Sequence, residues 1–484
     1  MRPAGFPEAE SALNSHRGTL TSRVDDGYRA LVERSIVHTP RGPVPGSRSL
    51  PQAMRTHQRN ATEFALDAGS AALFLDTGVG KSLCAFTWAD NVARATDRPV
   101  VMMAPLGVVG QHAKEAHKFG FDATIARSPD DLRPGLNLTN YDRLHLFDPS
   151  RFGGVVLDES SIIKNFSGVM TRRLMRFGEV VPHRLPCTAT PAPNDHMEIG
   201  QHAQFLGVMS SSEMLSRWFI ADQSQMGRYR LKRHAVQSFW RWVVSWSRFA
   251  EFPSDLGGDN TGYVLPPLNL QRHIVQTDIT AGAEEGMLFR IPSNSATSIH
   301  HEKRQTAADR AARIADLVTS EPGESWLVWC ETDYDADAIA ALLPHATEVH
   351  GRMSPDEKER GLAAFSDGTA RILITKPSIA GWGLNWQHCA RQGFVGLSFS
   401  YEAFYQAIRR CWRFGQERPV DVHVACAETE GAIWQAITRK RQDHEHMKAA
   451  MRAAMSQAAE VRTTKHDYQP AQAAQLPAWL GEAA

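Results

Sequence analysis

The sequence predicts an α/β protein in which two parallel-sheet lobes follow each other in tandem, with a helical insertion between them. From residue 54 onward, short apolar segments rich in β-forming residues alternate with stretches of helical character. A segment rich in Trp and Arg, from residue 201 to 265, interrupts this alternation, which resumes after the turn Leu265-Pro266-Pro267. Strands that alternate with helices are typical of parallel sheets covered by helices on both faces.

The expected strands are apolar runs that end just before loop or helical sequence. In the first lobe they cover residues 71–75, 99–104, 138–141, 154–157 and 183–188. In the second lobe they cover residues 271–276, 326–330, 371–375, 394–397 and 420–425. One helix is expected after the segment at residues 76–82, extending to about residue 92. A second is expected over residues 110–119.

The composition of the chain suggests where these lobes begin and end. The first fifty residues are rich in Pro, Gly, Ser and Arg, which favours a poorly ordered arm, and the last thirty are rich in Ala and Gln. The predicted division is an N-terminal arm at 1–50, a first lobe at 51–205, a helical insertion and linker at 206–300, a second lobe at 301–450 and a tail at 451–484.

Overall charge and cysteine content restrict the class of protein. The chain has 484 residues, of which 42% are hydrophobic and 22% charged, within the range of soluble proteins. Its 53 basic and 53 acidic residues cancel, which argues against binding to nucleic acid by bulk charge but allows a local basic groove. The six cysteines show no C-x-x-C spacing, so we expect buried thiols in a reducing compartment. With no secretory signal pattern and no membrane-spanning apolar run, we expect a cytoplasmic protein that contacts no membrane.

A glycine-rich segment follows the first expected strand and precedes a helix. Glycines let several backbone N–H groups point at one anion, and the start of a helix adds partial positive charge. Lys81 would reach the β- and γ-phosphates of ATP, and the Ser82 hydroxyl would bind Mg²⁺. Leu75 stands where the full phosphate-loop pattern has its first glycine, so a chance glycine-rich turn stays possible for this segment alone. The residues of the segment are Asp76, Thr77, Gly78, Val79, Gly80, Lys81 and Ser82.

Two carboxylates, Asp158 and Glu159, follow the buried strand expected at residues 154–157. In an open α/β sheet, ligands bind at the carboxyl edge of the strands. Asp158 would hold Mg²⁺ and Glu159 would polarise the water that attacks the γ-phosphate. Alone, the pair could equally be a solvated start of the next helix. Together with the loop at Lys81, it indicates an ATP-hydrolysing site.

With these motifs the chain resembles the superfamily 2 helicases and translocases, and most of all their chromatin-remodeller (Snf) type and its bacterial and phage relatives. The resemblance covers residues 54 to 425, apart from the Trp-rich segment. Its most specific match is the motif VI pattern Q-A-x-x-R-x-x-R-x-G-Q, which residues 406–416 fit at every fixed position. The other motifs lie at residues 55–58, 76–82, 104–106, 138–141, 158–165, 187–191 and 380–385. The resemblance implies two RecA-like lobes that hydrolyse ATP with Mg²⁺.

The resemblance also implies roles for single residues. Arg410 and Arg413 would be the arginine fingers that stabilise charge on the transferring phosphoryl group, for which the planar guanidinium is suited. Placed three apart on a helix, they would face the same way, whereas Arg409 would lie on the solvated side. Gln58, Gly383 and Gln406 would contact the nucleotide, Gln58 by reading adenine. Thr188 and Thr190 of motif III would couple hydrolysis to lobe movement.

Two departures from the remodeller pattern favour a compact bacterial or phage member. The segment between Asp76 and Gly80 is one residue shorter than is usual in remodellers, and Ala380 stands where a second glycine is common. Neither departure removes a catalytic group.

The predicted function is therefore that of an ATP-dependent DNA helicase or translocase. It would move on duplex DNA without sequence specificity, since contacts to phosphates carry no sequence information. Two alternatives stay open. One is an RNA helicase, and the other is an ATP-gated DNA-binding scaffold that recruits a replication, recombination or nuclease partner. We expect the tryptophans of the insertion to be core residues rather than platforms for stacking bases.

Overall fold

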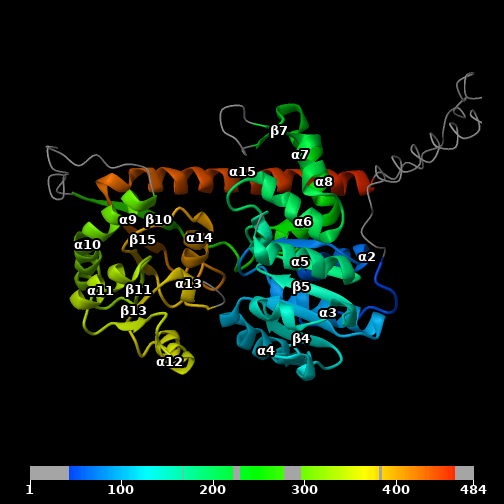
Figure 1. Cartoon of the computed structure of the whole chain (residues 1–484), viewed down its shortest axis with the longest axis horizontal. Helices are drawn as coiled ribbons and strands as arrows, with labels where there is room; N and C mark the ends of the chain where they lie inside the picture. The colour runs from blue at the N-terminus through cyan, green and yellow to red at the C-terminus, as the bar shows by residue number, and fades with distance from the viewer. Residues whose placement is uncertain (1–42, 167, 222–228, 277–295, 381–383, 464–484) are drawn as a thin grey trace, which may run out of the picture.

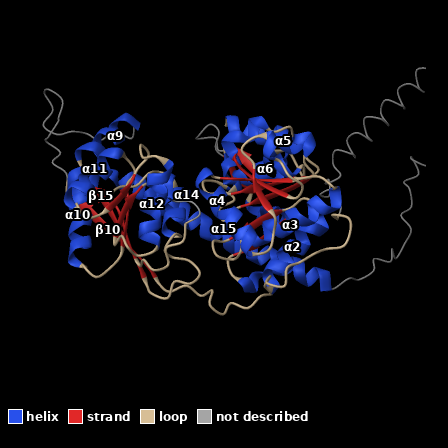
Figure 2. Cartoon of the chain, turned by 90° about the horizontal axis from the view of Figure 1, so that it is seen from below, coloured by secondary structure: helices blue, strands red, loops and turns tan. Residues whose placement is uncertain are grey.

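The computed structural model describes residues 43–166, 168–221, 229–276, 296–380 and 384–463. Most of the expected N-terminal arm and the last part of the expected tail lie outside these residues. Two bodies lie side by side, each with a central group of strands enclosed by helices (Figure 1, Figure 2). This confirms the predicted α/β fold with two parallel-sheet lobes.

The sheet of the first lobe has seven strands in the order β3-β4-β2-β5-β6-β1-β9, all paired in parallel. Its strands are β1 (Ala72–Leu75), β2 (Val100–Ala104), β3 (Ala123–Ile125), β4 (Leu136–Asn140), β5 (Gly154–Asp158), β6 (His183–Cys187) and β9 (Ser247–Ala250). The helices α2 (Thr56–Ala68), α3 (Lys81–Thr96), α4 (Val109–Lys118), α5 (Val169–Val180) and α6 (Ile199–Leu206) belong to the same lobe. Every residue of β1, β2 and β5 is buried, as expected for apolar runs covered on both faces.

The segment expected as a helical insertion contributes to this first sheet. Besides α7 (Ser211–Trp218) and α8 (Val236–Trp246), it holds the antiparallel pair β7 (Phe219–Ala221) and β8 (Tyr229–Leu231) and the strand β9. All four residues of β9 pair with β1, so the boundary expected at residue 205 is not where the first sheet ends. The sequence did not predict β9 because this short strand follows α8 directly, with no turn residue between them. The tryptophans of α7 and α8 are buried in one apolar cluster, as predicted.

The sheet of the second lobe has six parallel strands in the order β10-β15-β14-β11-β13-β12. They are β10 (Leu268–Val275), β11 (Trp326–Trp329), β12 (Thr347–Val349), β13 (Ile372–Thr375), β14 (Arg391–Phe394) and β15 (Val420–Ala427). The accompanying helices are α9 (Ala296–Gln305), α10 (Ala307–Ser320), α11 (Asp333–Leu342), α12 (Pro355–Ser366), α13 (Pro377–Ala380) and α14 (Tyr401–Ile408). The strand β14 begins and ends three residues before the range predicted for it, because the chain past Val395 leaves the sheet toward α14.

The last helix, α15 (Gly431–Thr463), crosses both lobes (Figure 1). Its 33 residues correspond to a length of about 50 Å. Near its start, Ile433 and Ile437 pack into the core of the second lobe, and further on Met447 and Met451 pack in the cluster that contains α8. The boundary predicted at residue 450 therefore falls inside one continuous helix. After Gly431 its sequence contains neither Gly nor Pro, so nothing in the chain interrupts the helix.

All six cysteines are buried, as predicted from their isolated positions. Among the described residues, none of the helices combines the length and the apolar character needed to span a membrane.

Candidate active site

The glycine-rich segment forms the turn between β1 and α3. Gly78 and Gly80 have φ angles of +93° and +101°, in the left-handed region that favours glycine. A Cβ atom at Gly80 would lie 2.0 Å from Nε2 of Gln58, so the Gln58 side chain would have to move to admit a side chain here. The α3 helix begins at Lys81, whose Nζ donates a hydrogen bond to the carbonyl oxygen of Leu75 at 2.9 Å.

A cavity of about 190 Å³ lies in front of this turn, and both lobes line it. It brings together the five residues predicted as catalytic, although they come from three separate parts of the chain. Its lining residues are Thr77, Gly78, Gly80, Lys81, Ser82, Val108, Gln111, His112, Glu115, Asp158 and Glu159 from the first lobe, and Asn385, Arg410 and Arg413 from the second.

Glu159 is held in an unusual environment at the end of β5. Its φ of +54° is rare for a residue other than glycine, and such strain is common at functional sites. Burial raises the pKa of Glu159 to about 7, the charge of Lys81 opposes the rise, and Asp158 adds to it. A carboxyl group that titrates near neutral pH can act as a general base. Thr188 donates a hydrogen bond from Oγ1 to Glu159 Oε2 at 3.4 Å, and the backbone N–H of Thr190 donates to Thr188 Oγ1 at 3.1 Å.

His112, which the sequence did not single out, contacts the second carboxylate. Its Nε2 lies 2.8 Å from Oδ2 of Asp158, and both side chains are buried. Burial alone would raise the pKa of Asp158, but the charge and hydrogen bond of His112, with the charge of Lys81, lower it. Conversely, burial would lower the pKa of His112, and the neighbouring Asp158 raises it to about 9. The helical periodicity of the sequence could have indicated that His112 is buried, since it lies three residues after Val109 on the buried face of α4.

The second lobe contributes two arginines to the cavity, of which Arg410 is buried and Arg413 is partly exposed. Arg410 donates hydrogen bonds from Nη1 to the carbonyl oxygen of Leu384 and from Nη2 to Oε1 of Gln406, both at 3.1 Å. Burial lowers the pKa of Arg410 to about 10 against the attraction of Glu159, and burial with repulsion from Arg410 lowers the pKa of Arg413 to about 9. Within the described part of the chain, neither guanidinium has a carboxylate within 4.0 Å. Two guanidinium groups without a close carboxylate suit the oxygens of a phosphate.

Comparison with known proteins places these second-lobe residues within a described domain. The helicase conserved C-terminal domain matches residues 309–415, a range that contains Arg410 and Arg413. The RNA polymerase-associated protein RapA of Haemophilus influenzae is 26% identical over 170 residues in one strain (ATCC 51907) and 25% identical in another (PittEE). The chain is therefore similar to a helicase C-terminal domain and to RapA over part of its length.

The aligned region covers 33% of this chain and 18% of either RapA protein, so the two share only part of their length. Among solved structures, the Sulfolobus solfataricus SWI2/SNF2 ATPase core in complex with dsDNA is 16% identical. The alignment covers 86% of this chain and 98% of that structure, with a TM-score of 0.39.

The residues of the site suit a bound Mg²⁺. Ser82 and Asp158 both line the cavity and supply a hydroxyl and a carboxylate oxygen. Mg²⁺ prefers oxygen ligands and is usually held by one or two carboxylates together with water and substrate phosphates. Asp158 is an anion at neutral pH because its pKa is lowered despite burial.

Several residues predicted to contact the nucleotide do not line the cavity. Gln58 is buried, its Oε1 accepts from the backbone N–H of Arg55 at 2.9 Å, and its Nε2 donates to the carbonyl oxygen of Val79 at 3.4 Å. Gln58 therefore supports the loop through Val79, away from the cavity. The Val79 side chain is part of the first-lobe core, and the buried side chain of Gln406 holds a motif VI arginine. Gly383 lies outside the described residues.

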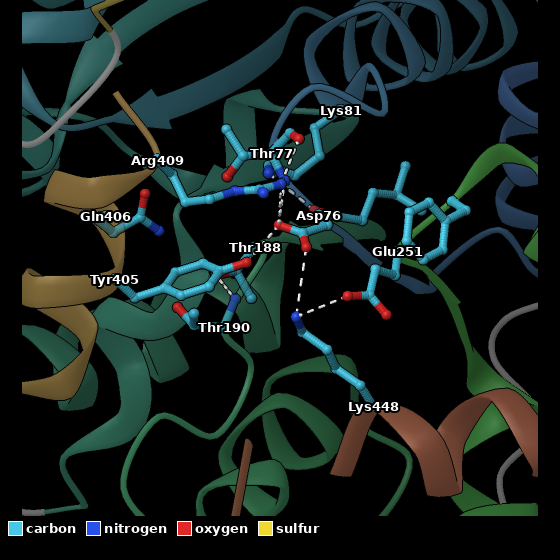
Figure 3. A network of polar contacts seen from close by, with 12 residues as sticks. Asp76, Thr77, Lys81, Thr188, Thr190, Glu251, Tyr405, Gln406, Arg409 and Lys448 are labelled. Atoms are coloured by element: carbon cyan, nitrogen blue, oxygen red, sulfur yellow. Dashed lines mark hydrogen bonds and ion pairs between the residues drawn. The ribbon is translucent and has the colours of Figure 1, made fainter. Parts of the chain in front are cut away.

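The prediction that Arg409 lies on a solvated helix face is wrong. Helix α14 ends at Ile408, so the helical spacing used in that prediction does not extend through Arg409 or to the arginines that follow. Arg409 is buried, with Nη2 at 3.1 Å from Oδ1 of Asp76 and 2.9 Å from the carbonyl oxygen of Thr77 (Figure 3). The hydroxyl of Tyr405 also donates to Oδ1 of Asp76, at 2.7 Å. The predicted nucleotide ligand Asp76 thus connects the loop to the second lobe.

Proposed function

We propose that the chain couples ATP hydrolysis in this cavity to movement along duplex DNA, without sequence specificity. The observation that carries the proposal is that one cavity is lined from opposite lobes. Lys81 and Glu159 come from the first lobe, whereas Arg410 and Arg413 come from the second. Since the set of groups is complete only when the lobes are together, turnover can drive the lobes together and apart.

Each group has a definite task in this chemistry. Lys81, Arg410 and Arg413 stabilise negative charge on the phosphate oxygens. Glu159 accepts a hydrogen bond from the attacking water and orients it, which its raised pKa favours. Mg²⁺, held by the side chains described above, would neutralise charge on the phosphates. The hydrogen bond from Thr188 connects Glu159 to the segment that follows β6 and so provides a route from hydrolysis to lobe movement.

A hollow of about 180 Å³ at the carboxyl edge of the first sheet is our candidate for the DNA contact. It lies between two of the motifs that resemble the helicase family, at residues 104–106 and 138–141, and its lining includes Leu106, whose side chain is exposed, and Asn140. Arg127 and Arg143 contribute positive charge to its lining. Contacts from such a local basic site to phosphates agree with a chain whose overall charge is zero.

A panel of nucleic-acid-stimulated ATPase assays tests the proposal. Duplex DNA should stimulate turnover more than single-stranded DNA or RNA, and the protein should displace a triplex-forming strand from duplex DNA. Lys81→Ala and Glu159→Gln should each abolish hydrolysis, and Glu159→Gln should still bind ATP. Stimulation by RNA alone would instead indicate an RNA helicase. DNA-stimulated turnover without triplex displacement would indicate the ATP-gated scaffold.

A further inference from the structure

A buried lysine of the last helix reaches the first residue of the phosphate-binding segment. The side chain of Lys448 is 5% exposed, and its Nζ lies 3.6 Å from Oδ2 of Asp76 and 3.2 Å from Oε1 of Glu251 (Figure 3). The same Nζ lies 5.5 Å from the ring centre of Tyr405. An ammonium group is tolerated in such a place only when carboxylates balance its charge. Lys448 is thus tied to Asp76, although 372 positions of sequence separate them.

Asp76 in turn depends on nearby positive charge to stay ionised while buried. Its side chain is 3% exposed and does not line the cavity, whereas those of its neighbours Thr77 and Lys81 do. Burial alone would raise the pKa of Asp76, but the charges of Arg409 and Lys448 outweigh burial and hold the pKa well below its usual value. Asp76 is therefore an anion at neutral pH, directly beside a loop that has to accept a polyanion.

We propose that Lys448 is a positioning residue for ATP, which acts on the phosphate-binding loop through Asp76. This inference rests on the proposed function, in which the loop binds the triphosphate. With Lys448 in place, the negative charge of Asp76 is balanced on its Oδ2 side and does not repel the phosphates. Without it, Oδ2 of Asp76 loses its ion pair and Arg409 alone opposes the carboxylate charge, which then disfavours ATP binding and competes for Lys81. Helix α15 is accordingly part of the ATP site and more than a connection between lobes.

Lys440 offers a matched control on the same helix. It donates hydrogen bonds to Oδ1 of Asn194 at 2.7 Å and to the carbonyl oxygen of Phe399 at 2.9 Å, so it also connects the first lobe to the second. It contacts neither Asp76 nor the lining of the cavity. Replacing Lys440 weakens the attachment of α15 but leaves the charge at the loop unchanged.

Binding of a fluorescent ATP analogue to the full chain, with Mg²⁺ and without nucleic acid, tests the inference. Lys448→Met should raise the Kd by about tenfold or more, the effect of losing one close charge interaction. Lys448→Arg and Lys440→Met should bind with nearly the wild-type Kd. A Kd for Lys448→Met within about twofold of the wild type would overturn the inference.

A double variant separates the electrostatic role from a merely structural one. Asp76→Asn combined with Lys448→Met should recover most of the lost affinity, because the carboxylate beside the loop is then removed together with its partner cation. A double variant that binds as weakly as Lys448→Met alone would overturn the inference. If Lys448→Met does not fold, Asp76→Asn decides the question: affinity equal to or above the wild type supports the inference, and lower affinity contradicts it. If Lys81→Ala also keeps full affinity, the assignment of the ATP site itself fails.

Discussion

Replacing Glu159 with glutamine isolates the effect of burying a carboxyl group at the end of β5. Burial raises the pKa of Glu159 from 4.5 to about 7, with Lys81 opposing the rise and Asp158 adding to it. In the unfolded chain the proton leaves near pH 4.5, whereas the folded chain keeps it up to about pH 7. The stability linked to this group is therefore fully present below pH 4.5 and is lost as the pH rises through 7.

The size of this loss follows from the shift in pKa. A change from 4.5 to about 7 corresponds to about 3 kcal/mol in the free energy of unfolding. Glutamine has nearly the same shape and never ionises, so the Glu159→Gln variant does not lose this stability as the pH rises. Thermal unfolding in EDTA without nucleotide measures the difference. At about 2–4 °C per kcal/mol for a domain of 150–250 residues, the variant should melt several degrees above the wild type at pH 8 and much closer to it at pH 5.

Glu179→Gln, at an exposed position of α5, is the matched control and should change the melting temperature equally at both pH values. If the melting difference for Glu159→Gln is the same at pH 5 and pH 8, the raised pKa and the reasoning from burial are refuted.

Three further substitutions test other parts of the site. Gly80→Ala should lower the free energy of unfolding by about 2 kcal/mol or more and abolish ATP binding. The reason is that Gly80 has a positive φ and that a methyl group there would meet the side chain of Gln58. Calorimetry and binding of the ATP analogue measure the two effects. His112→Asn should raise the pKa of Asp158, because the charge and hydrogen bond of His112 are lost. When the pH is lowered, the variant should therefore lose Mg²⁺-dependent ATP binding at a higher pH than the wild type does. A pH series of binding assays measures this. Thr188→Val removes the hydrogen bond to Glu159 and should lower triplex displacement per ATP hydrolysed, measured in parallel assays; an unchanged ratio would exclude Thr188 from coupling.

The sequence was sufficient to predict which groups meet at the carboxyl edge of the first sheet. Lys81 follows β1 and the acidic pair lies at the end of β5, and both strands are buried apolar runs that are easily recognised. Since parallel strands end at the same edge, residues that directly follow two of them are brought together. Motif VI was recognisable because its fixed residues lie within eleven consecutive positions.

Contacts that depend on how the lobes and α15 pack could not be predicted in this way. Arg409 meets Thr77 across 332 positions of sequence, and its burial depends on where α14 ends. Lys448 reaches Asp76 only because α15 continues without a break from the second lobe to the first. Each of these side chains, taken alone, has the pattern of a solvated charge, so local sequence favours the wrong environment for both.

The rate of ATP hydrolysis by Arg413→Ala, at saturating ATP and duplex DNA, tests the central claim most directly. If the catalytic site is shared between lobes, kcat should fall by a factor on the order of 10³ or more, the effect of losing an arginine finger. Arg418→Ala is the control, since Arg418 is half-exposed and pairs with Glu324 rather than with the cavity. A kcat for Arg413→Ala close to that of the control would contradict a site completed by the second lobe.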